Sequence, residues 1–91
     1  MTTEKVLTKH PSGKANKPVA KRDYETFKAA ILAALRRKEL THTELLTELT
    51  SSLKSKFTGN VGWHLMVVKL DLEARKLIER TSSSPQKYRL R

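Results

Sequence analysis

The chain has 91 residues, which limits it to one domain. It has no cysteine, which excludes disulfides and thiolate metal sites. Nineteen Lys and Arg against nine Asp and Glu give a formal net charge of +10, a balance that attracts polyanions such as nucleic acid. No apolar run approaches the roughly 18 residues of a membrane span, and the N-terminus lacks an apolar signal segment. We therefore expect a cytoplasmic protein.

The N-terminal segment, residues 1–22, is basic and poor in large apolar residues. It holds six Lys and Arg and one acid, and Pro11, Gly13 and Pro18 interrupt any regular pattern. Such a segment buries too little surface to offset the entropy of ordering. We expect a disordered basic tail over residues 1–22, acting as a phosphate-following arm or as a solvated leader, and one folded domain over residues 23–91.

Two helices are predicted next along the chain. Asp23 is a plausible N-cap for a first helix over residues 24–38. Thr41 and Glu44 have the spacing of a capping box, which predicts a second helix over residues 42–54. The apolar stripes that we expect to be buried are Phe27, Ile31, Ala34 and Leu35 in the first helix and Leu45, Leu46, Leu49 and Leu53 in the second.

A third helix and a terminal hairpin organise the rest of the chain. Asn60 can cap the helix, and apolar residues at i, i+4, i+7 and i+11 place Val61, Leu65, Val68 and Leu72 on one face. Residues 77–80 and 87–91 are joined by a polar turn segment, so we expect them to pair as a β-hairpin.

The third helix also carries a second apolar stripe on its opposite face. Its members are Trp63, Met66, Val67, Leu70 and Ala74. A helix that is apolar on two faces is normally buried on both. We therefore expect the second stripe to be covered by a dimer partner, by the N-terminal segment or by another protein.

The order of these elements resembles that of the winged helix-turn-helix family. The segment Leu72-Glu73-Ala74-Arg75-Lys76-Leu77-Ile78 resembles the Leu-Glu-x-x-Gly-Leu-Ile junction after the recognition helix of such regulators, with Lys76 where glycine is usual. Residues 85–90 look like the return strand of a wing. The resemblance covers residues 23–91 and is to a small, largely uncharacterised bacterial winged-helix protein. It implies a mainly α, α+β fold with three helices and a C-terminal wing.

The resemblance implies binding of nucleic acid, above all double-stranded DNA, in a transcription-regulator-like role. The third helix is then expected in the major groove, with the wing near the DNA backbone. The nucleic-acid contacts expected on this basis are Asn60, His64, Lys69, Arg75, Arg80, Lys87, Arg89 and Arg91. The alternative is a protein-interaction or dimerisation module that uses the apolar outer face of the third helix, at Trp63, Met66, Val67 and Leu70.

Catalysis and metal binding are not expected. His10, His42 and His64 are isolated from other ligand residues, and no phosphate-binding glycine loop or nucleophile elbow is present. We therefore expect no cofactor, no metal and no small-molecule substrate.

Overall fold

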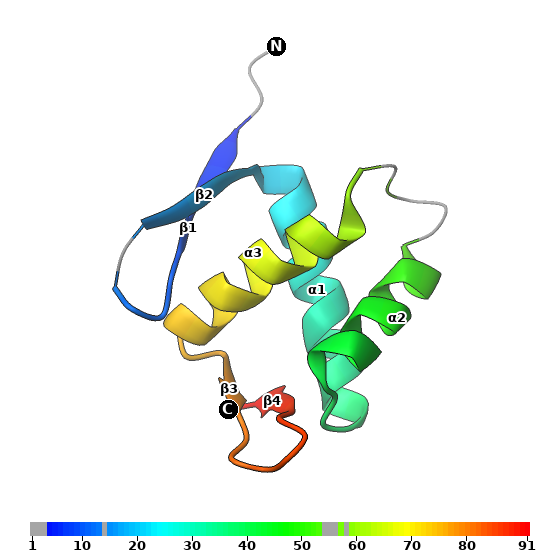
Figure 1. Cartoon of the computed structure of the whole chain (residues 1–91). Coiled ribbons are helices and arrows are strands. Elements are labelled where there is room, and N and C mark those ends of the chain that lie inside the picture. The colour runs from blue at the N-terminus through cyan, green and yellow to red at the C-terminus, as the bar shows by residue number, and fades with distance from the viewer. Residues whose placement is uncertain (1–3, 14, 54–56, 58) are drawn as a thin grey trace.

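The computed structural model describes residues 4–13, 15–53, 57 and 59–91. Over these residues it is a mixed α+β structure of three helices and two small antiparallel β-hairpins (Figure 1). In chain order the elements are β1 (Lys5–Lys9), β2 (Ala15–Ala20), α1 (Lys21–Arg37), α2 (His42–Ser52), α3 (Val61–Ala74), β3 (Ile78–Arg80) and β4 (Tyr88–Leu90). The predicted three helices and C-terminal hairpin are confirmed.

Helix α3 lies at the centre and packs against α1, α2, β3 and both strands of the N-terminal hairpin (Figure 1). The predicted stripe is buried at Leu65, Val68 and Leu72, and Val61 at the helix start is half-buried. These side chains join those of α1 and α2 in one continuous apolar core. Burial of this face explains why a helix flanked by polar turns forms here.

The helix starts agree with two of the three predicted caps. Thr41 and Glu44 form the expected capping box of α2, and the Asn60 side chain accepts a hydrogen bond from the backbone N–H of Trp63. Helix α1 instead begins at Lys21, because β2 runs into it without a loop, and the predicted cap Asp23 lies within its first turn. Helix α2 ends at Ser52; its predicted end at Lys54 lies outside the described residues.

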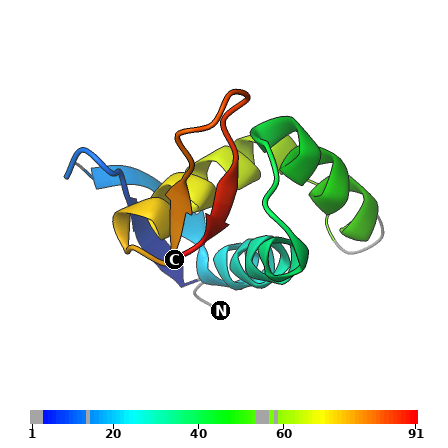
Figure 2. The same ribbon diagram turned by 90° about the horizontal axis from the view of Figure 1, so that it is seen from below.

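The C-terminal hairpin has the expected antiparallel register, with Ile78 opposite Leu90 and Arg80 opposite Tyr88. Leu40, in the α1–α2 connector, also pairs with Tyr88 through backbone hydrogen bonds of 3.2 and 2.7 Å. Strand β4 therefore lies between Leu40 and β3. Figure 2 shows this hairpin between the N-terminal hairpin and α2.

The N-terminal segment differs from the sequence expectation. Where we expect a disordered tail over residues 1–22, the structure has the β1–β2 hairpin, with Val6 opposite Val19. Val19 is buried and Val6 packs against the core, while Thr8 is buried and donates a hydrogen bond to the Lys17 carbonyl. These tertiary contacts order a segment whose own apolar content is small, and composition alone does not reveal them.

Candidate functional site

A buried carboxylate on α3 fixes the position of the N-terminal hairpin. Asp71 has no exposed surface, and its Oδ1 accepts the backbone N–H of Lys9 at 2.8 Å. Its Oδ2 accepts the Tyr24 hydroxyl and, at 2.9 Å, the Arg75 guanidinium. Burial, followed by the hydrogen bond to this carboxylate, raises the pKa of Tyr24 well above its usual value. Asp71 thus joins β1, α1 and α3 at one point.

Lys69, an expected nucleic-acid contact, is also buried, being only 5% exposed. Its Nζ donates to the Tyr88 hydroxyl at 3.0 Å, lies 2.9 Å from His42 Nδ1, and sits 4.1 Å from the centre of the Tyr88 ring. An ammonium group has no acceptor, so His42 Nδ1 must accept and its imidazole is neutral. Lys69 therefore joins α2 and α3 to β4 and is not part of the accessible surface.

The arginines expected at the wing are engaged by carboxylates of the same chain. Arg80 Nε lies 2.7 Å from Glu73 Oε2. Arg89 contacts Glu79 at 2.6 Å and Glu39 at 3.5 Å, and Arg91 lies 3.9 Å from Glu79. The hydrogen bond to Glu73 raises the pKa of Arg80. Of the expected wing contacts, only Lys87 forms no ion pair among the described residues.

The expected groove contacts of α3, Asn60, His64 and Arg75, each have another role in the structure. Asn60 is exposed, but its side chain caps the helix. His64, next to Trp63, is half-buried. Its ring stacks on the Phe27 ring with 5.3 Å between the ring centres, and it lies edge-on to the Phe57 ring with 4.7 Å between the centres. This ring closes the core beside α1, so its role in the structure is packing. Arg75, the third expected groove contact, is held by Asp71.

Besides Lys87, two groups of exposed cations without ion pairs among the described residues lie outside the wing. Lys5, Lys9 and Lys17 of the N-terminal hairpin are exposed, and none forms an ion pair in the part of the chain that the structure describes. A second group, Arg36 to Lys38, is exposed at the end of α1, and it too has no ion pair among the described residues. The sequence suggests a phosphate-following arm in this segment, but it does not predict the ordered hairpin that presents these lysines.

The second apolar stripe of α3 is covered only in part. Val67 is buried within the chain, which corrects the expectation that it lies on an open partner surface. The N-terminal hairpin packs against α3, which is one of the three covers anticipated from the sequence. Trp63 and Met66 remain 37% and 45% exposed, and Leu70 is half-buried. The outward side of the third helix is therefore apolar.

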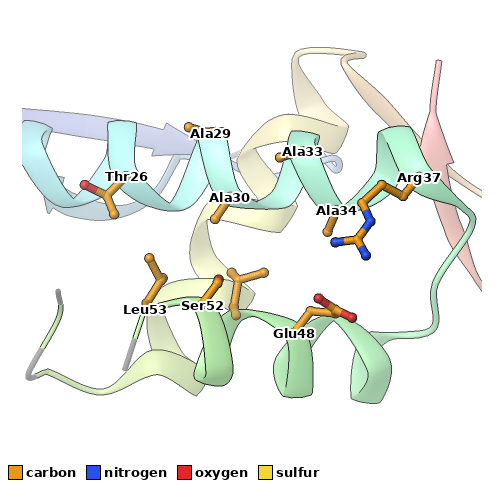
Figure 3. Close-up of a pocket in the computed structure, with 10 residues that line it drawn as sticks. Thr26, Ala29, Ala30, Ala33, Ala34, Arg37, Glu48, Ser52 and Leu53 are labelled. Atoms are coloured by element: carbon orange, nitrogen blue, oxygen red, sulfur yellow. The ribbon is translucent and has the colours of Figure 1, made fainter. Parts of the chain in front are cut away.

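A groove separates α1 from α2. Small side chains of α1, including Ala29, Ala30 and Ala33, line one side of the groove, and Leu49 and Leu53 line the side formed by α2. At one end Arg37 and Glu48 extend toward one another (Figure 3). They form no ion pair within 4 Å.

No group of three or more His, Cys, Asp or Glu side chains that could hold a metal ion occurs among the described residues. None of the helices in the described ranges is long and apolar enough to cross a membrane.

Comparison with known proteins assigns the chain to a family. The profile of the family of unknown function DUF6958 matches residues 5–88, which include the N-terminal hairpin, the three helices, β3 and the first residue of β4. The chain belongs to this family. No curated protein and no solved structure matches it significantly. The match begins at Lys5, so the N-terminal hairpin lies within the matched region.

Proposed function

We propose that the protein binds nucleic acid through the phosphate backbone, with the N-terminal hairpin as the principal contact surface. The observation that carries this proposal is that Lys5, Lys9 and Lys17 of this hairpin are all exposed and have no carboxylate partner among the described residues. Phosphate contacts require accessible cations. These lysines supply them, whereas the wing arginines are already engaged by Glu73, Glu79 and Glu39.

We further propose that α1 to β4 form a winged helix-turn-helix. The element order and the pairing of Leu40 with Tyr88 beside β3 support this assignment. In that fold the third helix approaches the major groove, where base reading needs hydrogen-bonding side chains. The outer side of α3 offers Trp63 and Met66 instead. The binding that we propose is therefore directed to phosphates and carries no base-specific readout.

Random-sequence duplex DNA provides the direct test, by fluorescence anisotropy at about 50 and about 200 mM salt. Three phosphate contacts, one for each lysine, predict that affinity falls by roughly 40-fold over this range. Absence of binding at the lower salt, or an affinity that salt leaves unchanged, contradicts the proposal. Titrating a single-stranded RNA of the same length in parallel shows whether the protein binds duplex DNA or single-stranded RNA more tightly.

Two matched triple variants locate the contact surface. Replacing Lys5, Lys9 and Lys17 with Gln removes three charges from the hairpin, and replacing Arg36, Arg37 and Lys38 with Gln removes three from the end of α1. Removing one phosphate contact makes the slope of log affinity against log salt shallower by about 0.9. We expect the hairpin variant, which loses three contacts, to have a slope shallower by about 2.7, and the α1 variant to keep the wild-type slope. Equal changes in the two variants would mean that net charge alone drives binding.

A further inference from the structure

An apolar face on α3 continues onto the N-terminal hairpin. Trp63, Met66, Leu70 and Ala74 follow one another at i, i+3, i+7 and i+11, so they share one side of the helix. Leu7 of β1 lines the same hollow as Ala74 and is 61% exposed. We call these five residues the α3–β1 face. A connected exposed apolar surface of this kind is uncommon on a monomer unless it binds a partner.

The charge around the α3–β1 face is positive. Lys9 lines the hollow beside Leu7, and Lys5 lies on the same side of β1. Neither lysine has an ion-pair partner within the described residues. The two carboxylates of α3 are both engaged, Asp71 by Arg75 and Glu73 by Arg80. An occupant of this face therefore gains from carrying acidic side chains along its border.

The length of the face also limits the occupant. From Trp63 to Ala74 the helix rises about 17 Å, which equals roughly three turns of a second helix. An amphipathic helix can place anchors at i, i+3, i+4 and i+7 on such a strip. A second copy of this chain brings another net charge of +10 and the same lysine border, so its charge does not complement the face.

We propose that the α3–β1 face is a docking site for an amphipathic helix of another protein, with an apolar stripe flanked by acidic residues. This inference goes beyond nucleic-acid binding and is independent of it, because the apolar part of the face has no group that binds phosphate. The two activities share Lys5 and Lys9, so the acidic helix and nucleic acid compete for the hairpin.

The single tryptophan of the chain lies on this face and reports occupancy directly. The probes are three synthetic peptides of about 14 residues, long enough for about four helical turns. One has a leucine stripe flanked by Glu, one has the same stripe flanked by Lys, and one is a scramble of the Glu peptide without a stripe. We expect saturable change in Trp63 emission with the Glu peptide and at least tenfold weaker binding of the other two.

Variants then test the two components of the face. Met66→Asp places a charge in the apolar strip at an exposed position, so we expect at least tenfold weaker binding of the Glu peptide. Ala33→Asp, on the exposed side of α1, is the matched control and should leave binding unchanged. Reversing Lys5 and Lys9 to Glu should transfer the preference from the Glu peptide to the Lys peptide. Circular dichroism verifies that each variant is folded.

Three results would overturn the proposal. Equal binding of the Glu peptide and its scramble would reduce the effect to net charge. Unchanged binding by Met66→Asp would remove α3 from the site. Self-association in analytical ultracentrifugation that Met66→Asp abolishes would assign the face to a second copy of the chain. None of these results depends on DNA binding, so this proposal and the nucleic-acid proposal can fail separately.

Discussion

The two β-hairpins of this protein are both basic, but they use their charge differently. In the C-terminal hairpin and its flanks, Arg80, Arg89 and Arg91 are held by Glu73, Glu79 and Glu39. In the N-terminal hairpin, Lys5, Lys9 and Lys17 project without such partners in the described part of the chain. A formal charge of +10 therefore says little about which cations a ligand can reach. The arginines are engaged within the chain, whereas the lysines remain accessible.

The largest expected effect concerns the attachment of the N-terminal hairpin. Asp71→Ala leaves the Lys9 N–H and the Tyr24 hydroxyl without their acceptor and Arg75 without its counter-ion. We expect the free energy of unfolding to fall by about 3 kcal/mol, because a buried, hydrogen-bonded charge is removed. Urea denaturation measures this change, and amide hydrogen exchange at Lys9 should rise with it.

Asp23→Ala is the control for that experiment. The Asp23 carboxylate is partly exposed and lies 3.9 Å from His64 Nε2, so its removal should cost about 0.5 kcal/mol or less. If both variants lose the same stability, Asp71 does not have the anchoring role described here.

The next effect concerns the attachment of the C-terminal hairpin. Arg80→Ala leaves the Glu73 carboxylate, whose side chain is only 9% exposed, without its cation. We expect a decrease of about 2 kcal/mol in unfolding free energy. Arg91→Ala removes the same charge from an exposed pair and should cost about 0.5 kcal/mol or less.

Measuring the DNA affinity of Arg80→Ala and Arg91→Ala distinguishes a role in stability from a role in DNA binding. We expect Arg80→Ala and Arg91→Ala to weaken DNA binding equally and slightly. If Arg80→Ala instead reduced affinity with little change in stability, the wing would regain the contact role that the sequence suggested for it.

A smaller effect of opposite sign is expected where α3 leads into the C-terminal hairpin. Lys76 has a φ of +63°, in the left-handed region that glycine adopts without a steric penalty. We expect Lys76→Gly to raise the unfolding free energy by about 1 kcal/mol. Lys38→Gly makes the same change at a φ of −173°, where glycine only adds freedom to the unfolded chain, and it should not stabilise.

The smallest effect is a pH dependence at the contact between α2 and β4. Burial, followed by the positive charge of Lys69, lowers the pKa of His42 below its ordinary value of 6.5. The unfolded chain therefore binds a proton that the folded chain excludes, and stability falls as the pH drops below about 6.5. Urea denaturation at about pH 7.5 and 5.5 should show this decrease in the wild type.

His42→Gln should remove that part of the pH dependence. Lys69→Met should reduce it without abolishing it, since burial is the larger cause of the shift. A pH profile that His42→Gln leaves unchanged would rule out His42 as the group responsible.

The sequence allowed a good prediction of the helical part of the fold, because its signals are local. The capping box at Thr41 and Glu44, the Asn60 cap and the periodic stripe of α3 each depend on neighbours in the chain. The glycine-like position of Lys76 was also visible, and its positive φ explains it. Local signals of this kind survive folding because the tertiary structure reinforces them.

The N-terminal hairpin and the site were harder, because their determinants are distant in sequence. The hairpin is ordered by a bond from Lys9 to Asp71, 62 residues away. Lys69 resembled a surface cation, yet His42 and Tyr88, from two other elements, surround it. Likewise, no pattern along the chain shows which arginine meets which glutamate. Asp71 shares one flank of α3 with His64 and Arg75, and the sequence alone does not show that its carboxylate meets Lys9 and Tyr24.

The junction between β2 and α1 has a consequence for how the hairpin meets a ligand. The strand ends at Ala20 and the helix begins at Lys21, so no linker separates them. The hairpin lysines therefore move with α1 as one body. A ligand that binds them does not have to order a loose arm first, and this absence of an ordering cost is preorganisation in the ordinary sense. Inserting a short Gly-Ser segment after Ala20 would remove this connection and leave the Asp71 bond and the packing of Val6 and Val19 to hold the hairpin.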